Sequence, residues 1–255
     1  MVESGAAQPL LDMQGIGKTF GRGPATLQGL SLSLGRGEFL SLLGPSGCGK
    51  TTALRLIAGL IAPTEGRIRW AEPKPRLSFV FQSPTLMPWA TVERNVWLPL
   101  RLAGRSLAAA RGEIAAALRL VGLEAAARAY PRELSDGMKM RVSIARAILT
   151  RPDLILMDEP FAALDEITRF RLNEDLLAIR AATGCTVIFV THSVFESVFL
   201  SNRICVMAAR PGRVAAEIPV PAPYPRGDAF RGAPDYAALC QRVSGTLRQA
   251  MGEAA

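Results

Sequence analysis

Apolar residues gather in short runs along this chain rather than in long stripes. The runs from Glu38 to Leu43, Leu154 to Met157 and Thr186 to Val190 are compact and aliphatic or β-branched, which is typical of strands buried on both faces. A helical stretch around Thr168 to Ala182 separates two of them, and Arg203 to Met207 is a further run. This alternation predicts an α/β protein with a parallel sheet.

Two other segments depart from the alternation. From about Leu10 to Leu43, glycines break the apolar runs, which predicts strands joined by tight turns in a small front sheet. From about Thr91 to Thr150, the chain is rich in Ala, Leu and Arg with apolar residues at helical spacing, so we expect an inserted helical lobe. The tail after Arg210 is rich in proline and then weakly helical, and its sequence indicates no chemistry.

Composition narrows the class of protein. The 255 residues are 49% hydrophobic and 20% charged, enough to bury a sizeable core. No apolar run is long enough to span a bilayer, and Met1 to Leu10 does not resemble a secretory signal, so a cytoplasmic location is expected. The four cysteines are widely separated and indicate neither a zinc site nor a disulfide framework. The net charge of +8 is carried by scattered arginines, so nucleic-acid binding is not expected.

A glycine-rich segment follows the first buried run and precedes a helix predicted over Lys50 to Ile61. It matches the phosphate-loop pattern G-x-x-x-x-G-K-[ST]. Backbone N–H groups of such a loop, with the positive end of the following helix, bind phosphate oxygens. Lys50 is expected to reach the β- and γ-phosphates and the Thr51 hydroxyl to coordinate Mg²⁺. The expected nucleotide-binding residues here are Gly44, Pro45, Ser46, Gly47, Cys48, Gly49, Lys50, Thr51 and Thr52.

Two carboxylates end the apolar run from Leu154 to Met157. Polar residues of a buried parallel strand emerge at its carboxyl end, where ligands bind in open α/β sheets. Beside a phosphate loop, Asp158 is expected to hold Mg²⁺ and Glu159 to orient and deprotonate the attacking water. Without that loop, carboxylates at this position would equally serve solubility or helix capping.

A further motif lies between these two, Leu134-Ser135-Asp136-Gly137-Met138, followed by Arg141, Ala145 and Arg146. At this point the chain resembles the ATP-binding-cassette family, from about Leu10 to Pro211. The resemblance implies a P-loop NTPase (RecA-like) core with an antiparallel β front sheet and an inserted helical signature subdomain. It implies one ATPase domain over 9–255, made of a core lobe (9–84 and 153–220), a helical subdomain (85–152) and a C-terminal extension (221–255).

The resemblance also implies roles for single residues. Phe20 is similar to the residue that stacks on adenine, although a phenylalanine there could equally belong to the core. Gln82, after Ser78-Phe79-Val80-Phe81, is similar to the residue that senses Mg²⁺ and the attacking water. Asp165 resembles a dimer-contact aspartate, and His192 a switch histidine that holds the γ-phosphate. The implied catalytic residues are thus Lys50, Gln82, Glu159 and His192, and the implied Mg²⁺ ligands are Thr51, Gln82 and Asp158.

The signature motif reads from its residues as a second phosphate site. Ser135 can cap a helix that has Met138, Val142 and Ala145 on one side, which leaves the first amides free for an anion. In the family that anion is ATP on the opposite subunit, which implies contacts from Ser135, Gly137 and Met138 and a homodimer.

The chain departs from the family's pattern at Asp136, where a glycine is usual. A carboxylate near the partner's γ-phosphate would cost about 3 kcal/mol at 5 Å and an effective dielectric near 20, and would slow hydrolysis. Alternatively Asp136 turns outward, where a carboxylate in the first helical turn is mildly favourable. We favour the outward orientation.

The segment from Pro84 to Trp89, Pro-Thr-Leu-Met-Pro-Trp, resembles the Pro-Trp segment of nitrate, taurine and alkanesulfonate importers, and Met138 is similar to the ending of their signature. Leu86, Met87 and Trp89 could line a groove for a permease helix or belong to the lobe core.

The resemblance implies ATP and Mg²⁺ as cofactors. It implies transmembrane permease subunits as partners, an extracytoplasmic solute-binding protein indirectly, and a place on the cytoplasmic face of the inner membrane. Nitrate, sulfonates, taurine, bicarbonate or a pyrimidine remain open as the solute.

Two other functions compete with this prediction. A soluble cassette ATPase of DNA repair or translation usually carries two phosphate loops or a long coiled coil, whereas one loop and no heptad run occur here. A P-loop kinase or GTPase would act as a monomer and would not need Leu134 to Met138 or Asp165.

Overall fold

The computed structural model of the chain describes residues 8–209 and 211–252. Most of Met1 to Leu10, where no secretory signal is expected, therefore lies outside the described residues, as do Arg210 and the end of the predicted C-terminal extension, residues 253–255. Among the residues described, no helix is long and apolar enough to cross a bilayer.

The centre of the molecule is a mixed sheet with strand order β5-β6-β7-β3-β8-β9. All neighbours are parallel except β9, which is antiparallel to β8. The predicted α/β class and parallel sheet are therefore confirmed. The strands are β3 (Phe39–Leu43), β5 (Leu77–Val80), β6 (Leu154–Asp158), β7 (Thr186–Thr191), β8 (Arg203–Ala208) and β9 (Arg213–Pro219).

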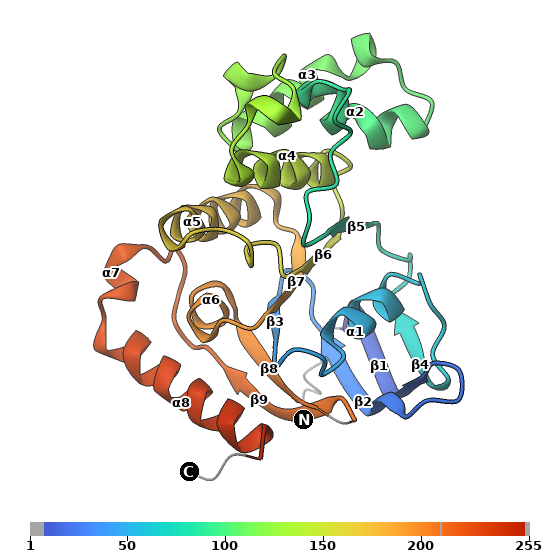
Figure 1. Cartoon of the computed structure of the whole chain (residues 1–255), viewed down its shortest axis with the longest axis vertical. Helices are drawn as coiled ribbons and strands as arrows, with labels where there is room; N and C mark the ends of the chain where they lie inside the picture. Colours follow the sequence, from blue (N-terminus) through green and yellow to red (C-terminus); the bar gives the residue numbers. More distant parts are fainter. Residues whose placement is uncertain (1–7, 210, 253–255) are drawn as a thin grey trace, which may run out of the picture.

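A second sheet is antiparallel, and it covers the side of α1 that faces away from the central sheet (Figure 1). Its strands are β1 (Leu11–Thr19), β2 (Ala25–Leu34) and β4 (Glu65–Trp70), in the order β2-β1-β4. The predicted front sheet is confirmed, but its strands differ from the prediction. The last predicted strand, β3, belongs to the central sheet, and β4, which follows α1 in the sequence, belongs to the front sheet. Gly66 makes this possible, because a Cβ there would lie 2.4 Å from the Gly15 carbonyl oxygen.

The helix predicted from Lys50 to Ile61 is shorter, and α1 spans Lys50–Ile57. Gly59 has a φ of +72°, and its N–H donates to the Leu56 oxygen over 3.0 Å while the Leu60 N–H donates to Arg55 over 2.9 Å. This pair of bonds is the Schellman arrangement that ends helices at a glycine. The predicted end at Ile61 is therefore wrong, because the glycine stops the helix well before Pro63 does.

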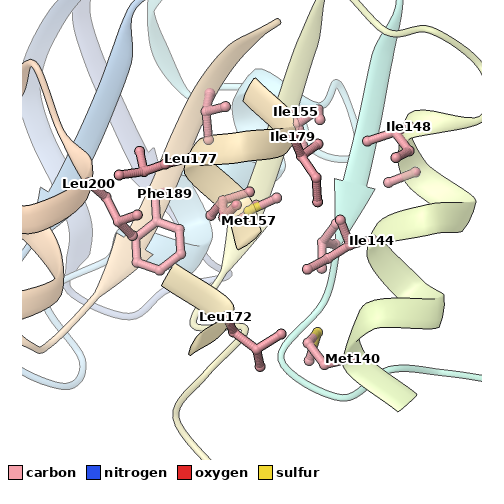
Figure 2. Close-up of a cluster of buried hydrophobic side chains, with 14 of the residues drawn as sticks. Met140, Ile144, Ile148, Ile155, Met157, Leu172, Leu177, Ile179, Phe189 and Leu200 are labelled. Carbon is pink, nitrogen blue, oxygen red and sulfur yellow. The ribbon is translucent and has the colours of Figure 1, made fainter. Parts of the chain in front are cut away.

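The helical lobe lies at one end of the molecule (Figure 1). It contains α2 (Val92–Leu102), α3 (Leu107–Leu120), α4 (Asp136–Ile148) and the short 3-10 turns η1 (Glu124–Ala126) and η2 (Pro131–Glu133). Helix α4 packs on α5 (Glu166–Thr183) of the core lobe. Figure 2 shows Met140 and Ile144 of α4 directed toward Met157 of β6 and Leu172 of α5. The two lobes therefore share one apolar cluster.

The C-terminal segment is tied to the core by a buried arginine. This segment contains α7 (Asp228–Arg231) and α8 (Pro234–Ala250), and α8 packs beside both α7 and α6 (Val194–Leu200). Arg226 is 4% exposed and donates hydrogen bonds to the carbonyl oxygens of Val198, Phe199 and Ser201 at 2.9 to 3.1 Å. The last carbonyls of a helix lack partners within it, so Arg226 completes the end of α6.

We expect Arg226→Ala to lower the free energy of unfolding by about 3 kcal/mol, because several buried carbonyl groups lose a charged donor. Urea denaturation followed by circular dichroism measures this loss. Arg248→Ala, at an exposed position of α8, is the control and should change stability by less than about 0.5 kcal/mol. Equal stability of the two variants would show that Arg226 does not hold the tail.

Candidate functional site

The predicted site residues follow the carboxyl ends of four adjacent parallel strands. The glycine-rich loop follows β3 and His192 follows β7, whereas Asp158 ends β6, Glu159 comes directly after it, and Gln82 comes two residues after β5. Parallel neighbours end at the same edge of a sheet, which is where ligands bind in such folds. The sheet order therefore gathers these side chains although they are far apart in sequence.

The loop from Gly44 to Gly49 wraps around the amino group of Lys50. That group is buried and donates to the carbonyl oxygens of Gly44 at 2.7 Å and Pro45 at 3.0 Å. Gly49 has a φ of +93°, and a Cβ there would meet Leu27 at 2.5 Å. A glycine is thus required for the loop to turn into α1, whose first amides face the loop. Cys48 is fully buried, so its thiol is not available to a ligand.

The next residue along α1 contacts the acidic end of β6. The Thr51 hydroxyl donates to Oδ1 of Asp158 over 2.9 Å. Burial raises the pKa of Asp158, and the hydrogen bond from Thr51 opposes that rise. A hydroxyl and a carboxylate at this separation suit Mg²⁺, which takes few protein oxygens and completes its shell with water and phosphate.

Glu159 lies between two basic side chains. Its Oε1 is 3.6 Å from the amino group of Lys50, and its Oε2 is 3.3 Å from Nδ1 of His192. Its φ of +45° is rare for a residue other than glycine and costs on the order of 1–3 kcal/mol. The backbone N–H of Glu159 donates to the Val190 oxygen over 3.0 Å, which holds this conformation. The carboxylate is thus held between an amino group and an imidazole, where it can accept a proton.

A buried hydrogen-bond network supports the turn that carries His192. The Thr191 hydroxyl donates to Oε2 of Glu196 over 2.5 Å and accepts from the Ser193 N–H over 2.9 Å. Burial raises the pKa of Glu196, while Thr191 and the charge of Arg169 oppose the rise. Sequence reasoning missed Glu196, although Ser193 followed three residues later by an acid is the spacing of a helix cap.

Gly212 also escaped the sequence reasoning. It lies in the turn between β8 and β9, and its N–H donates to the Thr26 oxygen over 3.0 Å. A Cβ there would lie 2.2 Å from the carbonyl oxygen of Cys48. This turn therefore packs directly against the glycine-rich loop, and the close approach requires a glycine.

The signature segment forms the start of α4, as its sequence predicts. The Ser135 hydroxyl accepts from the Met138 N–H over 3.3 Å, and Asp165 caps α5 by accepting from the Thr168 N–H over 2.9 Å. A Cβ at Gly137 would meet Thr168 at 2.7 Å, so the first turns of the two helices touch. Figure 1 shows α4 in the helical lobe, apart from α1. One chain therefore does not bring Ser135, Gly137 and Met138 to its own glycine-rich loop.

Three side chains for which the sequence left two positions open lie at the surface. Asp136 is 76% exposed and lies 2.9 Å from Lys139, which supports the outward orientation. Phe20 is 50% exposed and Trp89 is 77% exposed. Assignment of these two aromatic residues to the core is therefore wrong, whereas Leu86 does pack against the core.

Comparison with known proteins gives a consistent result. The family described as ABC transporter matches residues 27–162. The aliphatic sulfonates import ATP-binding protein SsuB of Bacillus subtilis is 42% identical over 228 residues, 88% of this chain and 87% of that protein. Its counterpart in Bacillus licheniformis is 43% identical over 234 residues, 89% of each.

Solved structures agree with the fold. A dimeric ATP-binding cassette in a post-hydrolysis state with ADP and Pi superposes with a TM-score of 0.73 at 31% identity, covering 83% of this chain and all but 1% of the other. The cbiO1 protein of Clostridium perfringens, part of an ABC transporter complex, has a TM-score of 0.77 at 24% identity, covering 95% of this chain and 97% of the other. At that identity the second likeness concerns the fold alone.

We expect Gly212→Ala to weaken ATP binding by at least about tenfold, because the added methyl displaces the backbone of the glycine-rich loop. Titration with a fluorescent ATP analogue measures the Kd. The control is Gly245→Ala within α8, where a Cβ meets nothing within 4 Å, and its nucleotide affinity should equal that of the wild type. Unchanged affinity in Gly212→Ala would show that the turn does not position the loop.

Proposed function

This chain belongs to the ABC transporter family, and we propose that it energises an importer of sulfonates or a related small solute by hydrolysing ATP. The observation that carries the proposal is the meeting of Lys50, Asp158, Glu159 and His192 at one edge of the sheet. Taurine, nitrate, bicarbonate and a pyrimidine are the other solutes that the segment from Pro84 to Trp89 leaves open. The names of the Bacillus relatives favour sulfonates.

The proposed roles of Lys50, Thr51, Asp158, Glu159 and His192 are supported by the distances in the site, and those of Phe20 and Gln82 by the family resemblance. The amides of the glycine-rich loop and Lys50 bind the phosphates, and Phe20 is exposed where it can stack on adenine. Mg²⁺, held by Thr51, Asp158 and Gln82, would neutralise charge on the phosphates. Glu159 accepts a proton from the attacking water, and His192 donates a hydrogen bond to the γ-phosphate.

We propose that two copies of the chain form the working enzyme. The amides at the start of α4 carry the positive end of the helix and lie in the helical lobe, apart from α1 and the chain's own glycine-rich loop, so they suit the phosphates of ATP on a partner. The partner contacts come from Ser135, Gly137, Met138 and Asp165. The dimeric cassette among the solved structures supports this arrangement.

The permease would bind beside Trp89. The Met87 N–H donates to Oδ1 of Asn95 over 2.7 Å, and the Asn95 amide donates to the Ala90 oxygen over 3.0 Å. These bonds hold the segment rigid while Trp89 projects into solvent, and an exposed aromatic on a rigid surface is a suitable anchor for a partner helix. The chain would thus lie on the cytoplasmic face of the cell membrane, with the solute-binding protein as an indirect partner on the other side.

We expect Glu159→Gln to lower ATP turnover by at least about 100-fold, because the general base is lost. Specific activity of the wild type should rise with protein concentration, and the variant should form a dimer with ATP in light scattering. Glu124→Gln, on the surface of the helical lobe, is the control and should retain wild-type turnover. Specific activity that is independent of concentration would indicate a monomeric P-loop enzyme instead.

We also expect Asp136→Gly to leave turnover unchanged, since the carboxylate points outward and pairs with Lys139. Steady-state ATP hydrolysis at saturating Mg-ATP measures the effect. A marked rise in turnover would instead show that Asp136 faces the phosphates of the partner's ATP in the closed dimer.

A further inference from the structure

A cavity of about 540 Å³ opens at the amino-terminal end of the central sheet. Pro152 and Asp153, just before β6, and Cys185 and Thr186, at the start of β7, form its floor. The glycine-rich loop and the catalytic side chains lie at the opposite end of the same strands. Its volume lies within the range of about 300–1,000 Å³ that small-molecule sites occupy, and no residue assigned above to nucleotide or Mg²⁺ lines it.

The walls of the cavity come from both lobes. Helix α3 contributes Ala116, Ala117 and Leu120, while the end of α4 contributes Ile148 and the core lobe contributes Ile155. Figure 2 shows Ile148 on α4 and Ile155 on β6 at the edge of the shared apolar cluster. A hydrocarbon group in this cavity would therefore be covered by apolar side chains on several sides.

Arginines surround this apolar lining. Arg36, Arg76 and Arg151 line the cavity with only two carboxylates, Glu113 and Asp153. Asp153 already pairs with Arg76 at 3.3 Å, and Glu113 pairs with Arg105, which is outside the lining. Among the described residues, neither Arg36 nor Arg151 forms an ion pair. The cavity thus offers positive charge that its own carboxylates do not neutralise.

The two unpaired arginines are close enough to act on these carboxylates. The hydrogen bond from Arg105 lowers the pKa of Glu113, and the charge of Arg151 lowers it further. Bonds from Arg76 lower the pKa of Asp153, with a smaller contribution from the charge of Arg36. Arg151 also has a φ of +49°, held by the hydrogen bond from its N–H to the Ile148 oxygen at 2.9 Å. Its backbone is thus fixed at the mouth of the cavity.

We propose that this cavity binds an amphipathic organic anion, with its hydrocarbon part against α3 and α4 and its sulfonate or carboxylate head beside Arg36 and Arg151. The chemistry follows from the lining, because apolar walls exclude a polyphosphate or a sugar while unpaired guanidinium groups attract one anionic head. Aliphatic sulfonates belong to this class, but the proposal rests on the cavity and not on the proposed function. A bound anion contacts both lobes and so restrains their relative movement.

Isothermal titration calorimetry of the full chain without nucleotide tests the site. Octane-1-sulfonate, below its micelle-forming concentration, is the probe, with 1-octanol and inorganic sulfate as the tail and head alone. We expect saturable binding of one octanesulfonate per chain and at least about tenfold weaker binding of the other two. Absence of saturable binding, or equal affinity for octanol, would overturn the proposal.

Three variants locate the binding. Ala116→Trp fills the cavity from an exposed position of α3 and should abolish binding, and Arg151→Gln should weaken it at least about tenfold. Arg128→Gln removes an exposed arginine of the same lobe that does not line the cavity and should bind as the wild type does. Circular dichroism confirms that each variant is folded. Wild-type affinity in Ala116→Trp would place the ligand elsewhere and refute this site. The ATP hydrolysis test of Glu159→Gln is separate, and its failure would bear only on the proposed function.

Discussion

The parallel pairing of β5, β6, β7 and β3 is the constraint on which the site depends. Leu43 at the end of β3 pairs with Thr191, and Asp158 at the end of β6 pairs with Val190. The glycine-rich loop, the carboxylates of Asp158 and Glu159, and His192 therefore leave the sheet at nearly the same level. Because side chains alternate along a strand, a shift of one residue in this register would turn Asp158 away from Thr51. The buried strands fix the register through their packing on both faces.

Much of this arrangement could be predicted from local patterns. The runs that became β3, β6 and β7 are mostly apolar because helices or the second sheet cover both faces, and such runs are visible in a sequence. The positions of the glycine-rich loop, between a strand and a helix, and of the acidic pair, at a strand end, were predictable from their sequence patterns. His192 and Gln82 were predicted as site residues only from the resemblance to a family, because no local pattern distinguishes them from other polar residues at strand ends.

What could not be predicted depends on contacts between distant segments. Gly212 matters because its turn meets Cys48, and Arg226 matters because it meets the end of α6. Neither contact leaves a periodic signal around the residue concerned. The error at the end of α1 has a local cause, since Gly59 caps the helix before the proline is reached. The position of Trp89 could not be predicted either, because hydrophobicity alone does not distinguish a core residue from one exposed at the surface.

The burial of Cys48 has a consequence for the chemistry of oxidants. A thiol in the middle of a phosphate-binding loop would ordinarily be a point of inactivation by peroxide, because thiolates react and the loop is basic. Burial raises the pKa of Cys48 and outweighs the opposing charge of Lys50, so the sulfur stays protonated and shielded by the loop itself. The Cys48 thiol is therefore neither exposed nor readily ionised, so it lacks both of the features that make a cysteine reactive toward oxidants.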